Sequence, residues 1–442
     1  MQKIKNFWVV LRSSLWFVPG LMVTASIALA LILIEVDGRI DGKWLLEYPR
    51  LFGVGSEGSR GMLTAIAGSM LTVAALAFSM TLSALTQASA QYTPRILRNF
   101  MRDRVNQFIL GYFVSVFAYC LVVLRTIRGA DEIKFVPSLA VLVGLVLAIG
   151  GIVVLIYFIH HIASSLQVSQ IIDNIVEETK EAIDSLFPKE LGKAAEEAEK
   201  TEAQVLRASN GWREIPARES GYIQQVDTEN LIEFAEENEF IIKMERGIGQ
   251  FIGEGATLVS LTEYEQNSEM KIDDQTEQEI NELFSINRYR TIEQDVGYGI
   301  RQIVDIALKA LSPGVNDTTT AVTCIDFLGV IVGEIARRRL PERVRVKDGK
   351  PRVFAKVPNF EDYVETAFDQ IRISGKGNQA IFERLLGALI FVSKNTQSEN
   401  RHAVVREQID LIEEFAEQTL ETDYEKQKVR QKIAETRQAF NK

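Results

Sequence analysis

The sequence predicts an α-helical membrane protein in which four transmembrane helices precede a C-terminal α+β cytoplasmic domain with a small β-sandwich-like part and a helical part. Up to Ser165 the chain has 14 Lys and Arg against 8 Asp and Glu, a net charge of +6. The remainder has 35 against 51, a net charge of −16. Uncharged apolar runs fill the first part, whereas short alternating and amphipathic patterns fill the second.

Four apolar stretches each have about the length that crosses a hydrocarbon core of about 30 Å. They are Leu15–Ile34, Met62–Ala90, Phe108–Leu124 and Val136–Ile159. We expect the first to be retained, because it lacks a small-residue cleavage site and three further spans follow it. No ionisable residue falls in the middle of a span, which argues against a proton-coupled pump or carrier.

Basic residues predict the orientation of the spans. Lys3, Lys5 and Arg12 precede the first span, and four arginines lie between the second and the third: Arg95, Arg98, Arg102 and Arg104. The other two loops mix acids and bases, so the positive-inside rule places both termini in the cytoplasm. The acidic second half is therefore expected to be cytoplasmic.

The second span carries polar side chains along one face. At about 100° per residue, these side chains fall within an arc of about 100°. We call them the polar stripe: Ser69, Thr72, Ser79, Ser83, Thr86 and Gln87. Small hydroxyl-bearing residues join helices in membranes, and they also line water-filled paths. The sequence leaves both interpretations open.

Two further groups lie at the predicted cytoplasmic interface. Arg95, Arg98 and Arg102 would share one helical face at the inner mouth, suited to anionic lipid head groups or to acids of the cytoplasmic domain. The alternative is that they only fix the topology. His160 and His161 end the fourth span, where an imidazole could sense pH or serve as an interfacial anchor.

The cytoplasmic half divides by pattern into three segments. Residues 166–210 predict a stalk that continues the fourth span to Leu186, followed by a linker. In 211–265, Gly-punctuated runs predict strands, among them Leu231–Ala235, and the Gly-x-Phe-Ile-x-x-Gly-x-x-Leu layout from Gly249 resembles half of a lipoyl-type β-sandwich. Residues 266–442 are mainly helical in pattern. The transmembrane domain occupies 1–165.

One series of motifs in the second half is specific. Arg290-Thr and Gln294-Asp precede an amphipathic helix, which runs into Ala-Leu-Ser-Pro-Gly-Val-Asn-Asp and a Thr-rich segment. This series resembles the signature of a bacterial family of predicted membrane proteins known as domain of unknown function 2254, which implies a multi-pass protein of the bacterial inner membrane. The resemblance covers nearly the whole chain and implies no particular chemistry.

The polar residues of this series could bind a ligand or contact another subunit. They are Arg290, Asp295, Arg301, Asp305, Asn316 and Asp317, followed by Thr318, Thr319 and Thr320. Carboxylates with hydroxyls suit a cation, and a Thr-rich helix start suits an anion. Helix capping and an i,i+4 ion pair explain the same residues without a ligand.

The leading functional hypothesis is a homo-oligomeric channel whose second span lines the pore and whose cytoplasmic domain serves assembly and gating. Acids near the outer mouth, Glu35, Asp37 and Asp41, and the acidic domain would favour inorganic cations. The alternative is a non-conducting sensor or scaffold whose cytoplasmic domain binds a ligand or partner.

Several other classes are disfavoured. The acidic second half argues against nucleic acid as a partner, and no metal-ligand spacing, cofactor motif or catalytic motif is found, so we expect no enzyme, no cofactor and no metal. The expected partners are the lipid bilayer and further copies of the chain. Cys120 and Cys324 are expected to be packing residues rather than a disulfide.

Overall fold

A computed structural model describes residues 16–39, 55–91, 103–128, 135–165, 167–187, 211–263 and 272–439. The chain divides into two compact units, Met1–Gln170 (unit 1) and Ile171–Lys442 (unit 2). The predicted inner-mouth arginines Arg95, Arg98 and Arg102 lie outside the described residues.

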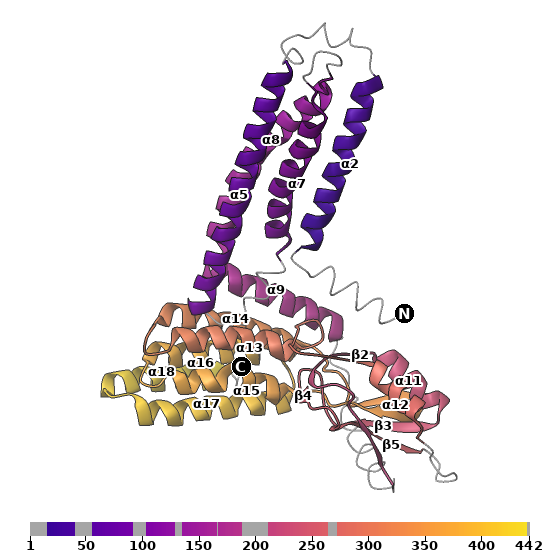
Figure 1. Ribbon diagram of the computed structural model, residues 1–442. Coiled ribbons are helices and arrows are strands. Elements are labelled where there is room, and N and C mark those ends of the chain that lie inside the picture. Colours follow the sequence, from indigo (N-terminus) through magenta and orange to yellow (C-terminus); the bar gives the residue numbers. More distant parts are fainter. Residues whose placement is uncertain are drawn as a thin grey trace. The chain divides into compact units, whose positions relative to one another are not determined.

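Unit 1 contains the four N-terminal apolar helices that the sequence predicts. They are α2 (Phe17–Arg39), α5 (Ser56–Gln91), α7 (Arg104–Thr126) and α8 (Ser138–Ser165). Each is long and apolar enough to cross a membrane. The four run side by side along most of their length (Figure 1). Between its ends, an α-helix satisfies its backbone polar groups within its own segment, as hydrocarbon requires.

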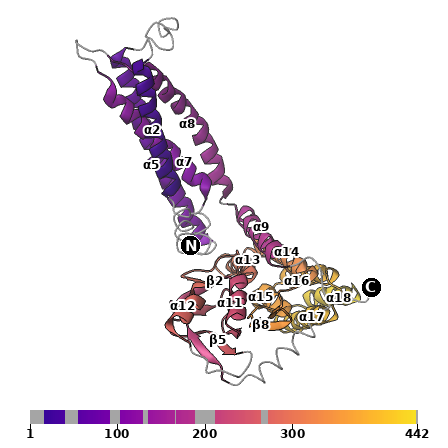
Figure 2. The ribbon, with the colours of Figure 1, turned by 90° about the vertical axis from the view of Figure 1, so that its right-hand side faces the viewer.

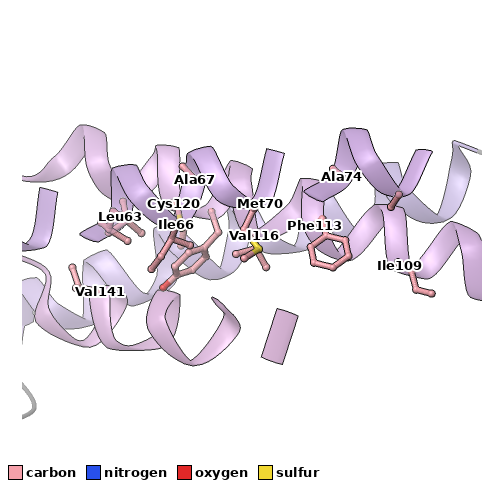
Figure 3. Close-up of a cluster of buried hydrophobic side chains, with 14 of the residues drawn as sticks. Leu63, Ile66, Ala67, Met70, Ala74, Ile109, Phe113, Val116, Cys120 and Val141 are labelled. Carbon is pink, nitrogen blue, oxygen red and sulfur yellow. The ribbon is translucent and has the colours of Figure 1, made fainter. Parts of the chain in front are cut away.

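The core of unit 1 is built around α7, which packs against α2, α5 and α8. Leu63, Met70, Phe113 and Val116 are among its buried side chains, and Figure 3 shows how the residues of α5 and α7 face one another. The Tyr119 hydroxyl donates a 2.7 Å hydrogen bond to the Ala140 carbonyl of α8. A buried phenol is thereby satisfied, and α7 is fixed to α8.

The helix that follows α8 is separate from it, contrary to the prediction of one continuous stalk. α8 ends at Ser165, and α9 spans Val168–Leu186. Nearly all of α9 belongs to unit 2, where its apolar face is buried. The same apolar spacing that suggested an extension of the membrane span therefore serves to pack α9 within unit 2.

Unit 2 contains two small sheets. A five-stranded sheet has the order β1-β5-β3-β8-β7, and a three-stranded sheet has the order β4-β2-β6. All neighbours pair antiparallel except β3 and β8. The strands are β1 (Arg213–Pro216), β2 (Gly221–Val226), β3 (Phe240–Met244), β4 (Phe251–Ile252), β5 (Thr257–Glu263), β6 (Phe284–Asn287), β7 (Val344–Lys347) and β8 (Lys350–Phe354).

The β region differs from the prediction in two respects. Leu231–Ala235, expected as a strand, lies in the helix α11 (Thr228–Glu237), which begins there because the Asp227 carboxylate accepts the Asn230 N–H. The sheets also take β6, β7 and β8 from beyond residue 265. A core shared by both sheets, including Ile223, Ile242 and Phe284, holds them together.

The helix α12 (Asp274–Glu282) precedes β6 in the chain. The helices that follow β6 form the other half of unit 2 (Figures 1 and 2). They are α13 (Val296–Ala310), α14 (Thr318–Arg337), α15 (Phe360–Ser374), α16 (Gln379–Lys394), α17 (Glu399–Thr419) and α18 (Asp423–Ala439). Length and composition would also let α14 cross a membrane. In unit 2 it packs against α13, α15 and α16.

Candidate functional site

The helix α5 has two contrasting faces. On one, Leu63, Ile66, Met70 and Ala74 are buried in the core of unit 1 (Figure 3). On the other lies the polar stripe, and all six of its side chains are exposed. With about 100° of rotation per residue, the centres of the two faces are about 150° apart. The stripe is therefore not a packing face among the described residues of unit 1.

Large apolar side chains flank the stripe on one side. Leu71, Phe78 and Leu82 are about half exposed, as expected for side chains that face lipid. α5 thus presents a packing face, a lipid-type flank and a polar stripe in succession around its circumference.

Several hydroxyls of the stripe are satisfied by the helix itself. Ser69, Thr72 and Thr86 each donate to the carbonyl four residues earlier, at 2.7, 2.8 and 2.9 Å. Such bonds let a hydroxyl lie in an apolar medium without another partner. These three residues are compatible with either water or lipid.

The acids predicted to lie at the outer mouth, Glu35 and Asp37, have partners within unit 1. The Asp37 carboxylate accepts the N–H groups of Leu139 and Ala140 at 3.1 and 3.0 Å, and it thereby satisfies the first turn of α8. Glu35 pairs with Arg39 at 2.8 Å. Asp41 lies outside the described residues. These contacts reduce the negative charge available to attract cations.

The two histidines at the end of α8 differ. His160 is exposed, whereas the His161 Nε2 lies 2.6 Å from an Asp103 carboxylate oxygen. Asp103 also caps α7 by accepting the Val105 N–H at 2.9 Å. His161 therefore joins the end of α8 to the start of α7, and a pH response stays a prediction.

The Arg290 and Asp295 pair forms a tight structural cluster. Two hydrogen bonds of 2.8 and 3.0 Å join the guanidinium to the carboxylate, which also accepts the Tyr298 N–H at the start of α13. Only 7% of Asp295 is exposed. A Cβ at Gly249, whose φ is +80°, would lie 2.2 Å from an Asp295 oxygen. This close approach requires glycine.

The other predicted cluster residues lie apart from this pair. Arg301 and Asp305 form an i,i+4 ion pair of 2.9 Å in the middle of α13. Asn316, at φ +50°, and Asp317 follow its C-terminal end. Because α13 is about 20 Å long, the structure does not bring the six residues into one site.

Asp317 acts as the N-cap of α14. Its carboxylate accepts the Thr320 hydroxyl and, at 3.0 Å, the Thr320 N–H. The hydroxyl bond, followed by the N–H bond, lowers the pKa of this carboxyl below 3.8. Thr318 accepts a 3.0 Å bond from the Asn378 amide. The Thr-rich start of α14 thus has a capping and packing role, as the alternative to a ligand site predicts.

Metal and disulfide chemistry receive no support from the described residues. Within them, no group of three or more His, Cys, Asp or Glu side chains is placed to hold a metal ion. Cys120 and Cys324 are free and buried. Burial, with a smaller contribution from Asp317, raises the pKa of the Cys324 thiol to about 12, so it is unreactive at neutral pH.

Sequence reasoning missed a cavity in unit 2 that borders Asp295. Arg345 of β7 and Tyr363 of α15 also line it. The alternation Val-Arg-Val-Lys at 344–347 is typical of a strand whose basic residues face solvent, so the sequence contained no signal for this site.

Comparison with known proteins identifies the family. The model of the family described as "Predicted membrane protein (DUF2254)" matches residues 12–390. The uncharacterized protein MT1328 of Mycobacterium tuberculosis (strain CDC 1551 / Oshkosh) is 31% identical over 420 residues, which are 92% of this chain and 78% of that protein. The uncharacterized protein Rv1290c of strain ATCC 25618 / H37Rv is 30% identical with the same coverage. No solved structure matches. The chain therefore belongs to the DUF2254 family of predicted membrane proteins.

Proposed function

We propose that this chain is a subunit of a homo-oligomeric membrane channel in which copies of α5 surround a water-filled path. The polar stripe lines that path, and unit 2 serves assembly and gating from the cytoplasm, where both termini lie. Inorganic cations are the favoured permeant ions.

The observation that supports this proposal most directly is the exposure of the stripe. In hydrocarbon, six polar side chains on the outer face of a helix would be unfavourable compared with apolar ones. The stripe lies opposite the packing face and beside a lipid-type flank. Water on a symmetry axis is an environment that suits such a face.

Small residues on the same arc leave the stripe side of α5 uncrowded. Ala65 and Gly68 fall within the arc of the stripe, and a Cβ at Gly68 would meet nothing within 4 Å. Copies of α5 arranged around an axis would therefore leave space for water between their stripes.

The cation preference rests mainly on unit 2. Since Glu35 and Asp37 are engaged by Arg39 and by α8, the outer mouth contributes less negative charge than the sequence suggests. The net charge of −16 beyond Ser165 remains, and it raises the local cation concentration at the cytoplasmic side.

The second candidate is a non-conducting sensor or scaffold. The hydroxyl-to-carbonyl bonds of Ser69, Thr72 and Thr86 favour it, because hydroxyls satisfied in this way need no water. In this case the stripe joins copies of the chain by direct contact, and the cytoplasmic unit alone carries the function.

Cysteine accessibility in liposomes tests the proposal. Ser79→Cys and Ser83→Cys place a thiol on the stripe, and Leu82→Cys places one on the lipid-type flank. A channel requires cation flux through the unmodified protein. A charged, membrane-impermeant thiol reagent must then block the Ser79→Cys and Ser83→Cys proteins by more than half and leave Leu82→Cys unchanged. Cys120 and Cys324 are buried, so the background reaction is low.

Two outcomes would overturn the channel. One is equal block at the flank and at the stripe. The other is a folded protein, judged by circular dichroism, that carries no ion flux at any applied voltage between pH 5 and pH 8. The second outcome leaves the sensor or scaffold as the function.

A further inference from the structure

A cavity of about 150 Å³ lies within unit 2. Its walls come from the end of α9, from β3 and β8, and from the N-terminal parts of α13 and α15. They are mostly apolar, with Phe187, Met244, Ile248 and Val353 among them. Charged side chains border it as well, and one of these is placed unusually.

The unusual group is the guanidinium of Arg345. Across the sheet, Arg345 of β7 is the register partner of Val353 of β8, which in turn pairs with the fully buried Ile242 of β3. Register partners share one face of a sheet. Arg345 therefore lies on the inner face, whereas its neighbour Val344 packs with Ile241 and Phe354 on the other.

The local strand geometry explains this placement. Val344 and Arg345 pair in regular register with Phe354 and Val353, and the register shifts only after Arg345. Because successive side chains of a regular strand point to opposite faces, Arg345 lies on the face opposite Val344.

Arg345 has no counter-ion among the described residues. Its Nε is buried without a hydrogen-bond partner. The nearby carboxylates are engaged elsewhere, because Asp295 pairs with Arg290 and Glu342 pairs with Arg339. Burial lowers the pKa of Arg345. Arg345 as a whole is half-buried. A cation that is partly withdrawn from water without a counter-ion costs free energy, which an anion in the cavity would offset.

A second basic residue, Lys356, also borders the cavity. Its ammonium group donates to the backbone carbonyl of Glu245 at 3.3 Å. The Glu245 carboxylate accepts hydrogen bonds from Lys243 and Ser260, both at 2.8 Å. The rim of the cavity therefore has an excess of positive charge within a domain that is acidic as a whole.

We propose that this cavity binds a small organic carboxylate, whose anionic group pairs with Arg345 and whose apolar body contacts Phe187, Met244 and Val353. A guanidinium offers a planar fork that matches two carboxylate oxygens. A dry cavity of about 150 Å³ accommodates a benzene ring. An adjoining cavity of about 240 Å³ also borders Arg345 and leaves room for the anionic group. The site lies wholly in unit 2 and does not depend on the proposed conduction.

Calorimetric titration of the detergent-solubilised full chain with sodium benzoate tests this site. We expect saturable binding to the wild type and at least tenfold weaker binding to Arg345→Gln, whose side chain is shorter and polar but carries no charge. Arg345→Lys keeps the charge without the fork and should be intermediate. Arg343→Gln, at an exposed position on the same segment, should stay within twofold of the wild type.

Two further measurements separate a ligand site from a structural role. Without benzoate, Arg345→Gln should leave the Tm unchanged or higher, because it removes an uncompensated, partly buried charge. Benzamide, the neutral analogue, should bind at least tenfold more weakly than benzoate. If Arg345→Gln does not fold, the titration of Arg345→Lys decides in its place.

Four outcomes would overturn the proposal. They are no saturable binding of benzoate to the wild type, equal binding to Arg345→Gln or, in its place, to Arg345→Lys, equal binding of benzamide, and displacement of benzoate by inorganic phosphate at the same concentration. None of these outcomes bears on ion flux, so the site and the channel can fail separately.

Discussion

The helices α5 and α14 are both apolar and long enough to cross a membrane, yet their surroundings are opposite. In the most apolar stretch of α5, 28% of the residues are buried, compared with 56% in the most apolar stretch of α14. Helices α13, α15 and α16 surround α14, whereas α5 leaves the polar stripe and the lipid-type flank uncovered. Apolar composition alone therefore does not distinguish a membrane span from the core helix of a folded domain.

Charge placement shows the same contrast. α14 begins at the Asp317 cap, and its Asp326 and Glu334 carboxylates pair with Arg384 and Arg338. From Gly61 to Gln91, α5 has no charged residue. A helix at the core of a soluble domain can place charges on its outer face, whereas hydrocarbon penalises them on every face.

The largest expected effect is the loss of a buried side chain in α14. Leu328 is fully buried, so Leu328→Ala should reduce the free energy of unfolding by about 2–5 kcal/mol. Leu82→Ala on α5 should change it by less than about 0.5 kcal/mol, because that side chain is 52% exposed. Denaturant titration in micelles measures both. Equal effects would contradict the packing of the two helices described above.

The next effect concerns the contact between α9 and α13. A Cβ at Gly299 would lie 2.0 Å from the Thr179 hydroxyl oxygen. Gly299→Ala should therefore destabilise the protein by about 1–3 kcal/mol through overpacking. Thr179→Ala introduced with Gly299→Ala should recover part of the loss, as measured by Tm. A Gly299→Ala protein as stable as the wild type would show that α9 does not lie against α13.

A smaller effect is expected at the cap of α14. Asp317→Ala should cost about 1 kcal/mol at neutral pH. In the folded protein the pKa of Asp317 is lowered below its ordinary value of 3.8. The stabilisation by this cap is therefore fully present above the pKa of the unfolded chain, and it is lost as the pH falls through the pKa of the folded protein. Unfolding of wild type and variant at pH 7 and at pH ~3 measures this. If the stability difference between the wild type and Asp317→Ala were larger at the lower pH than at pH 7, the capping role would be contradicted.

The smallest effect distinguishes the two interpretations of the polar stripe. A Cβ at Gly68 would meet nothing within 4 Å in one copy of the chain. If the stripe faces water, Gly68→Ala should leave the oligomer intact and stabilise the helix by up to about 1 kcal/mol. Thermal unfolding and light scattering of the purified protein measure both quantities. Loss of the oligomer would instead indicate direct packing between copies of α5.

The sequence predicts the membrane helices well because hydrocarbon imposes long uncharged runs. Their ends were less predictable, since caps determine them: α7 begins at Arg104 because Asp103 accepts the Val105 N–H, whereas the apolar run begins only at Phe108. In the β region, the capping residue Asp227 was the available signal for α11, and the alternation of Leu231–Ala235 obscured it. Pairing between β3 and β8 joins residues more than 100 positions apart, which no local pattern encodes.

The candidate sites also differ in how far the sequence predicts them. The arc of the polar stripe follows from helical periodicity, and its exposure agrees with that arc. The series from Arg290 to Asp317 suggested one cluster, but the length of α13 separates its two ends. Arg345 was missed because its inward position depends on pairing with β8 and on packing from α9 and α15, and these two helices are distant in the sequence.

The length of α5 has a mechanical consequence. The uncharged segment from Gly61 to Gln91 measures about 46 Å at ~1.5 Å per residue, whereas a bilayer core is about 30 Å thick. This helix can tilt, or slide along its axis by as much as ~15 Å, without drawing a charge into lipid. A rearrangement of that size would carry successive hydroxyls past any fixed level of the membrane at little electrostatic cost.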